Sequence, residues 1–279
     1  MQVAGTGPRM CRFAWPGPSN RRRRARDKAR VASMSNGVHS VSQTSFSGGR
    51  LVRLLGELQL LNGAPEVDFA ERLARLFDLS DTVALDAANG HRASGPFLAG
   101  DKDRQRLSAD LAKTRDKLLA GLTRAFEPEQ LGTRNGLPAP VADYDPYQQF
   151  YVARQRQLTA GLQPLRVRLR GALSDASAAG AQLAELDTVF DATLTAYARR
   201  GFGAIPRLLA RRFEALKPDG QQRLLEENTD DPATWMAPGG WLHRFTGEMQ
   251  LLLLAELEAR LEPLRGLLDA LYKEVRDRT

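Results

Sequence analysis

Residues 241–279 read WLHRFTGEMQLLLLAELEARLEPLRGLLDALYKEVRDRT and carry the most regular pattern of the chain. Their apolar side chains alternate steps of three and four residues, which is the spacing of a coiled-coil seam. The members of this seam are Leu254, Leu257, Leu261, Leu264, Leu268, Leu271 and Val275. Because Pro263 and Gly266 lie inside the stretch, it predicts a kinked helix packed on neighbouring helices rather than a straight coiled coil.

The seam needs a partner helix, and two kinds of partner stay open. Helices of the same chain would bury the seam in the core of an ordinary bundle, which we favour because short heptad runs are common there. A second copy or another protein would instead use the seam as an interface. Leu257 and Leu264 are the candidate contact residues in that case.

The chain before this stretch shows the same helical period, and the alternating pattern of β-strands is almost absent. Apolar stripes predict a helix from Leu51 that stops at Asn62-Gly63, and a second helix that follows Pro65. A short helix over 81–88 and a long amphipathic helix over 101–126 come next.

Two further helices contain residues that disfavour a continuous helix. One begins at Asp145, a good N-cap, and Gly161 with Pro164 should kink or break it. The other covers residues 183–216, with an interruption at Gly201-Phe202-Gly203 and a restart at Pro206. The sequence therefore predicts an all-α fold, a multi-helix bundle with long helices partly kinked by proline and glycine.

The length of 279 residues allows one large domain or two modest ones. We expect a disordered basic tail over residues 1–44, an N-terminal helical region over 45–126 and a C-terminal helical bundle over 146–279. The linker between the two helical regions is placed at 127–145, because prolines and glycines are dense there.

Basic charge is concentrated at the N-terminus. Residues 1–30 contain nine Lys and Arg residues against one acid, Asp27, whereas the rest of the chain has 31 bases against 32 acids. Two interpretations of residues 1–33 stay open: an upstream extension before a native start at Met34, or a disordered arm that binds nucleic acid or anionic lipid. The arm would act through the four arginines that follow Asn20, namely Arg21, Arg22, Arg23 and Arg24.

Several classes of protein are disfavoured by what the sequence lacks. No apolar run approaches the length of about 20 residues that a membrane span needs. Cys11 is the only cysteine, which argues against a disulfide framework and favours the reducing cytoplasm. No phosphate-binding loop or nucleophile elbow is present. We therefore predict no catalytic, cofactor-binding or metal-binding residues and no cofactor.

Carboxylates cluster around residue 187. Asp187 and Asp191 lie one helical turn apart, with Glu185 nearby, and could ligate a cation or act as acid and base. Metal sites in helical bundles use Glu-x-x-His motifs from facing helices, and none is present here. We favour a solvated acidic face over a site.

Two other groups of residues are candidates for binding. Arg166 and Arg170 lie one turn apart, with Arg168 between them, and could grip a phosphate or the carboxylates of a partner. The alternative, which we favour, is that they are surface arginines paired with acids of the same chain.

The second group lies in and after the loop over 228–241. Trp235, Trp241 and Arg244 belong to the residue types that anchor protein interfaces. The favoured alternative is a structural one, in which the two tryptophans close the end of the bundle.

Three stretches resemble an uncharacterised proteobacterial all-helical family, a domain of unknown function. They are YQQFYVARQ at 147–155, LRVRLR at 165–170 followed by AELD at 184–187, and the WLxxF start of the stretch over 241–271. The resemblance spans about Ser45 to Ala270. Genes of this family lie near OmpA/MotB-like envelope proteins, so the resemblance implies a cytoplasmic helical component of a membrane-anchored assembly, with no functional residues to carry over.

Three functions follow as expectations. The first is a non-catalytic helical interaction or scaffold protein that binds a helical or membrane-anchored partner, or forms a homo-oligomer. The second is a nucleic-acid-binding protein that uses the arginine-rich arm. The third is a helical-bundle enzyme of unknown chemistry, since absent motifs do not exclude a new site.

Overall fold

Four long helices dominate the part of the chain that the computed structural model describes, which is residues 50–58, 78–218 and 232–278. These helices are α4 (Asp101–Ala125), α5 (Asp145–Ser174), α6 (Ala178–Leu216) and α9 (Trp241–Arg278). No strand occurs within those ranges. The predicted all-α multi-helix bundle is therefore confirmed.

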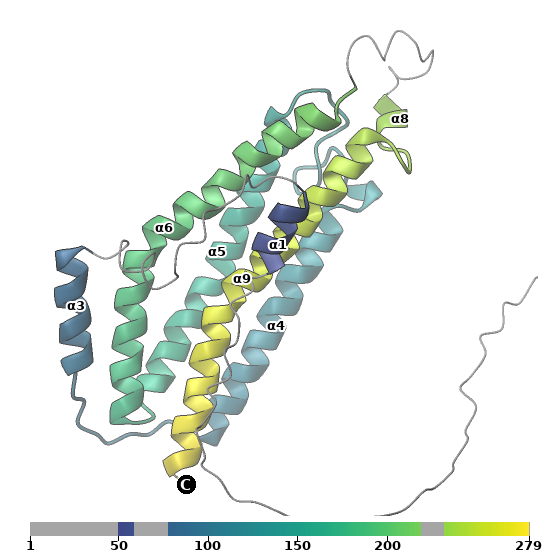
Figure 1. Cartoon of the computed structure of the whole chain (residues 1–279). Helices are drawn as coiled ribbons and strands as arrows, with labels where there is room; N and C mark the ends of the chain where they lie inside the picture. Colours follow the sequence, from purple (N-terminus) through teal and green to yellow (C-terminus); the bar gives the residue numbers. More distant parts are fainter. Residues whose placement is uncertain (1–49, 59–77, 219–231, 279) are drawn as a thin grey trace, which may run out of the picture. The chain divides into compact units, whose positions relative to one another are not determined.

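The long helices alternate in direction along the chain (Figure 1). α5 and α9 pack on each other, and α4 and α6 each pack against both of them. Hydrogen bonds join the helix ends. At one end Ala99 N donates to the Asp175 carbonyl at 3.0 Å, and at the other Lys217 Nζ donates to the Ala142 carbonyl at 2.7 Å.

Four short elements complete the described part. α1 (Arg50–Glu57) packs on α9, and α3 (Leu79–Gly90) packs on α6. The 3-10 helix η1 (Pro128–Gln130) lies in the connection from α4 to α5, and α8 (Pro232–Trp235) precedes α9. The connection was predicted as a linker, and the helices on its two sides contribute to the same hydrophobic core.

The interruption predicted in the helix over 183–216 is wrong, and of the kink or break expected in the helix from Asp145, the break does not occur. α5 continues through Gly161 and Pro164, and α6 continues through Gly201-Phe202-Gly203 and Pro206. Asp145 is the first helical residue of α5 rather than its N-cap, which is Tyr144. A proline removes one intrahelical hydrogen bond, so a helix can continue where water or another group satisfies the freed carbonyl.

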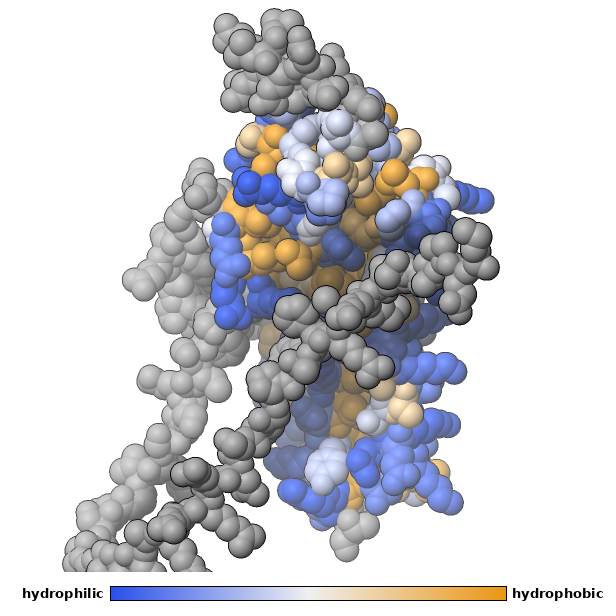
Figure 2. Space-filling view, turned by 90° about the vertical axis from the view of Figure 1, so that its right-hand side faces the viewer, coloured by the Kyte–Doolittle hydropathy of each residue, from blue (hydrophilic) through white to orange (hydrophobic). Residues whose placement is uncertain are grey.

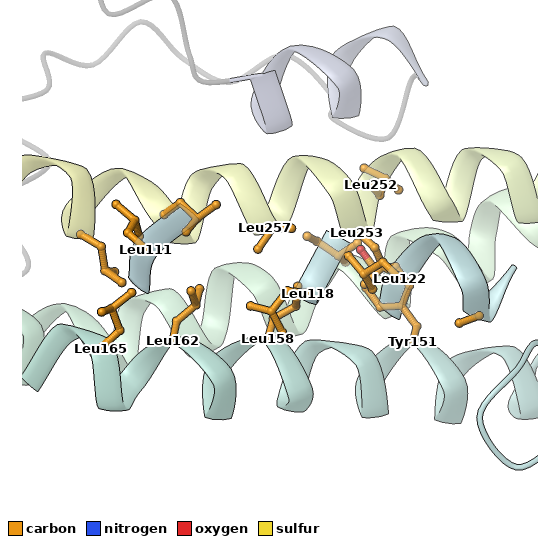
Figure 3. Packing of buried hydrophobic residues seen from close by; sticks show 14 of the residues in the cluster. Leu111, Leu118, Leu122, Tyr151, Leu158, Leu162, Leu165, Leu252, Leu253 and Leu257 are labelled. Carbon is orange, nitrogen blue, oxygen red and sulfur yellow. The ribbon is translucent and has the colours of Figure 1, made fainter. Parts of the chain in front are cut away.

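The core is built from the apolar stripes that the sequence shows. In Figure 3, Leu118 of α4, Leu158 of α5 and Leu257 of α9 lie among the side chains that fill the space between these helices. Full burial of one leucine contributes about 1.5–3 kcal/mol. The residues of the predicted seam thus pack in the core of this chain, as the favoured interpretation of the sequence had it.

α5 ends and α6 begins at a tight corner over residues 175–177. The Ser177 hydroxyl caps α6 by accepting from Gly180 N at 2.8 Å, and it donates to Glu274 of α9 at 2.6 Å. A Cβ on Gly180 would lie 2.3 Å from the Leu173 carbonyl oxygen, which no real contact allows. Glycine at this position therefore permits the tight turn.

Some predictions fall outside the described residues. These are the basic tail with Arg21–Arg24, the end of the first helix at Asn62-Gly63 and the helix after Pro65. Over the ranges that are described, no helix is both long enough and apolar enough to span a membrane.

Candidate functional site

The first polar cluster joins α5 to α6. Arg166 donates to both carboxylate oxygens of Asp187, at 3.1 and 2.7 Å, and also to Asp191. Arg170 donates to Asp187 at 2.6 Å and to Asp191 at 2.9 Å. All four side chains are largely buried. The sequence-predicted candidates Arg166 and Arg170 thus bind acids of the same chain.

The two arginines and two aspartates of this cluster neutralise each other's charge. Burial raises the pKa of the Asp187 carboxyl, but the hydrogen bonds and positive charges of Arg166 and Arg170 outweigh burial and lower it below its ordinary value. The expectation of a solvated acidic face is therefore wrong for Asp187 and Asp191, whereas Glu185 is exposed, and the expected pairing of Arg166 and Arg170 with internal acids is found. A cation at Asp187 and Asp191 would have to displace both guanidinium groups.

Arg168 points elsewhere and does not belong to this cluster. It pairs with Asp110 of α4 at 2.5 Å, and the arginine is half exposed. The helix period explains the separation: at 3.6 residues per turn, Arg166 and Arg170 are four residues apart and share a face, whereas Arg168 is two residues from each and points to the opposite side.

A second cluster, which the sequence analysis missed, surrounds Glu256 in the middle of α9. This carboxylate is fully buried. It accepts from Tyr151 Oη at 2.6 Å, from Gln155 Nε2 at 2.8 and 3.0 Å, and from Arg260 Nη2 at 3.2 Å. Burial raises the pKa of Glu256 despite these donors.

Gln155 also binds α6. Its Nε2 donates to the Phe202 carbonyl at 3.0 Å, and the Arg260 guanidinium stacks 3.9 Å from the centre of the Phe202 ring. The Phe202 carbonyl would normally accept from the N–H of residue 206, which is proline and has none. Gln155 thus supplies the donor that Pro206 lacks.

The three prolines that lie beyond the first turn of the described helices differ in their surroundings. Pro164 and Pro263 are exposed, whereas Pro206 is buried. Water can reach the carbonyl that Pro164 frees, since Ala160 is exposed. The buried proline is the one whose freed carbonyl is satisfied by a side chain, and this is why α6 does not break where the sequence predicted.

Aromatic rings close the end of the bundle where α9 begins. Trp241 meets Phe213 edge-on at 5.1 Å between ring centres, and Trp235 lies 5.6 Å from Trp241. Phe245 contacts the same Phe213 ring at 5.0 Å. Trp235 is buried and Trp241 partly buried. The tryptophans therefore have the structural position that the sequence analysis favoured.

Arg244 lies beside these rings and is exposed over 63% of its side chain. Its Nε donates to Glu248 at 3.1 Å, and Arg212 of α6 binds the same carboxylate through two hydrogen bonds at 2.7 and 2.6 Å. Burial raises the pKa of Glu248, and the hydrogen bonds from both arginines outweigh burial and lower it. Glu248 thus ties α6 to α9 while Arg244 reaches the surface.

Leu257 and Leu264 are 1% and 2% exposed and belong to the core of the bundle. A partner could reach them only after the helices separate. The structure therefore leaves these two residues inside the chain, apart from the surface on which Arg244 lies.

Two surface hollows of the described part are each lined by residues from one stretch of the chain. The larger, of about 540 Å³, is lined by residues of α5 between Asp145 and Arg156. The other, of about 430 Å³, is lined by α4 and Glu127 directly after it. Within the described ranges no three potential metal ligands come together. Each hollow is thus a depression along one helix rather than an enclosed site.

The fold and these clusters define a helical bundle whose ionisable groups bind one another across helices. The family described as Protein of unknown function (DUF3348) matches residues 38–273, and the chain belongs to that family. No curated protein and no solved structure matches the chain significantly.

Glu256 was missed because its neighbours in LLLLAELEAR are apolar or form acidic and basic pairs typical of a helix surface. A signal was present: Glu256 lies between Leu253 and Leu257 on the stripe that is buried, and Arg260 follows one turn later. A charged residue on a buried stripe needs donors from other helices, and only the tertiary structure identifies them.

Proposed function

We propose that this protein is a non-catalytic helical interaction or scaffold protein. The observation that carries the proposal is that the buried ionisable clusters, at Asp187, Glu248 and Glu256, are each satisfied by arginines of the same chain. Groups held in this way stabilise the packing of helices, and neither of the two surface hollows described above is lined by Asp187, Glu248 or Glu256.

The proposal also includes a place in a larger assembly in the cytoplasm, with a helical or membrane-anchored partner or a second copy. This part rests on the resemblance to a proteobacterial family whose genes lie near OmpA/MotB-like envelope proteins. The family itself carries no assigned function.

The contact surface that we propose is the outer face of α9 near its start. Arg244 and Leu251 are seven residues apart, so they share one helix face. Leu251 is 44% exposed, although it is a large apolar side chain. Met236 and Trp241 are partly exposed, and Trp241 lies about one helical turn before Arg244. Methionine, tryptophan and arginine are enriched at interfaces.

Hydrophobic residues also gather visibly on one face of the molecule. Figure 2 shows a mainly hydrophilic lower part and patches of hydrophobic residues in the upper part of the face turned to the viewer. Scattered apolar residues are normal on any protein. The experiment therefore compares two exposed apolar positions on different helices.

A photo-crosslinking amino acid placed at Leu251, in the full-length chain expressed in its native host, tests the proposal. The matched control places it at Val167 of α5, which is 57% exposed. We expect a discrete adduct at position 251 that is weakened by Arg244→Glu and absent at position 167. The mass of the adduct distinguishes a second copy from another protein. No adduct at 251, or identical adducts at both positions, would contradict the proposal.

A further inference from the structure

The second half of α6 carries an exposed arginine face, which we define as Arg199, Arg200, Arg207 and Arg211. All four are exposed. Residues 200, 207 and 211 are spaced by seven and four, so they form one stripe along the helix. At 1.5 Å per residue the stripe is about 16 Å long.

The arginines of this face form no ion pair within the described part of the chain. None of its four arginines lies within 4.0 Å of a carboxylate there, whereas Arg166, Arg170, Arg212, Arg244 and Arg260 all do. Residues 196–217 contain six basic residues and one acid, Glu214. Glu214 is exposed and lies one turn after Arg211 at the end of the stripe, so four arginines stand against one acid and the face keeps an excess of positive charge.

The surroundings of the arginine face indicate what it fits. Gly203 and Ala204 lie between Arg200 and Arg207, so the side chains of the stripe are separated by small residues. α3 packs near the first half of α6, as the hydrogen bond from Thr193 to Asp81 at 2.7 Å shows (Figure 1). This contact with α3 therefore involves the first half of α6, and the arginine face follows it in the second half.

Three kinds of anionic partner can be compared on these features. A helical partner needs an apolar seam beside its charges, and a helix that lies in a membrane surface inserts large apolar side chains in addition to its charges. Tyr197 is the single large apolar residue that is exposed on the described second half of α6, and it lies at the edge of the face. A phosphate backbone needs only accessible guanidinium groups in a row, which bind phosphate through paired donors.

We propose that the arginine face of α6 binds the phosphate backbone of a nucleic acid without reading its base sequence. A stripe of about 16 Å spans roughly five base-pair steps at 3.4 Å each, enough for several phosphate contacts. This site lies in the folded bundle and is separate from the arginine-rich N-terminal segment and from the outer face of α9.

The test uses fluorescence anisotropy of a labelled DNA duplex of about 20 base pairs with the full chain, at salt concentrations from about 50 to 200 mM. The variant combines Arg200→Gln, Arg207→Gln and Arg211→Gln, which keeps helix propensity nearly unchanged. The control combines Lys102→Gln, Lys113→Gln and Lys117→Gln on α4, where the three lysines are also exposed. Circular dichroism checks that both variants remain helical.

We expect the α6 variant to reduce the slope of log affinity against log salt by about 2 to 3, at about 0.9 for each lost phosphate contact. The α4 control should change the slope by less than about 1. No binding by the unchanged chain would overturn the proposal. An unchanged slope in the α6 variant would do so as well and would place binding in the N-terminal segment. An equal reduction of the slope in the α4 control would show that the duplex is attracted by the positive charge of the protein in general, and this would contradict a defined site on α6.

A parallel measurement with vesicles of phosphatidylserine and phosphatidylcholine separates the two sources of phosphate. Binding of the unchanged chain to vesicles but not to the duplex would overturn the proposal in favour of a membrane. Duplex binding that depends on the α6 arginines supports the proposal.

Discussion

Replacing Gln155 with leucine should destabilise the bundle in a way that depends on Pro206. Gln155→Leu removes the donor to the Phe202 carbonyl at 3.0 Å and the bonds to Glu256 at 2.8 and 3.0 Å. An unsatisfied, partly buried carbonyl costs about 1–3 kcal/mol, and a hydrogen bond to a charged group contributes about 1.5–3 kcal/mol. The free energy of unfolding should therefore fall by about 3–5 kcal/mol.

The dependence on Pro206 is the informative part. Pro206→Ala restores an N–H that can bind the Phe202 carbonyl, so leucine at 155 should then cost less. The loss at Glu256 is the same in both backgrounds and cancels in a double-mutant cycle. We expect a coupling energy of about 1–2 kcal/mol, which is the value of the single carbonyl bond that is exchanged.

Urea unfolding followed by circular dichroism gives the four free energies of the cycle. Pro164→Ala is the matched control because Pro164 frees the carbonyl of Ala160, which is exposed, whereas the bonds of Gln155 Nε2 go to Phe202 and Glu256. Its cycle with Gln155→Leu should be additive within about 0.5 kcal/mol. A coupling energy near zero for Pro206, or equal coupling in the two cycles, would refute the proposed exchange of donors.

Two further predictions concern the core and the ion cluster. Leu257→Asp with Leu264→Asp should unfold the chain rather than dissociate an intact subunit, because both side chains are buried in the core; loss of helicity and of the compact elution volume measures this. Asp187→Asn should cost about 2 kcal/mol at neutral pH. The pKa of Asp187 is lowered in the folded chain, so its contribution is present above the unfolded pKa of about 3.9 and is lost as the pH falls through the folded pKa. The difference between the two proteins in urea unfolding should shrink below about pH 4, and a constant difference would contradict this.

Much of the fold could be predicted because an amphipathic helix places apolar residues at steps of three and four along the sequence. The stripe of Leu107, Leu111, Leu118 and Leu122 predicted α4 to within a residue of its observed end. Local signals did not decide whether the helix continues at Pro164 and Pro206, since a proline determines only which hydrogen bond is missing. Whether the helix ends there depends on water in one case and on a side chain from another helix in the other.

The candidate site was predictable only in part. Arg166 and Arg170 were found from their spacing, and pairing with internal acids was the favoured alternative, but the acids themselves were expected to face solvent. Spacing fixes which residues share a face of one helix. It does not determine which face of another helix lies opposite. The hydrogen bond from Arg166 to Asp187 shows that these faces of α5 and α6 pack against each other.

The sequence by itself determined the helices, the apolar stripes and the separation of basic charge at the N-terminus from a nearly neutral body. Only the tertiary structure decided that the seam residues of α9 pack in the core, that Glu256 is buried and that α6 continues through Pro206. The physical reason is range: a stripe repeats within one or two helical turns, whereas Gln155 and Phe202 are 47 residues apart. Their contact exists only once two helices have packed.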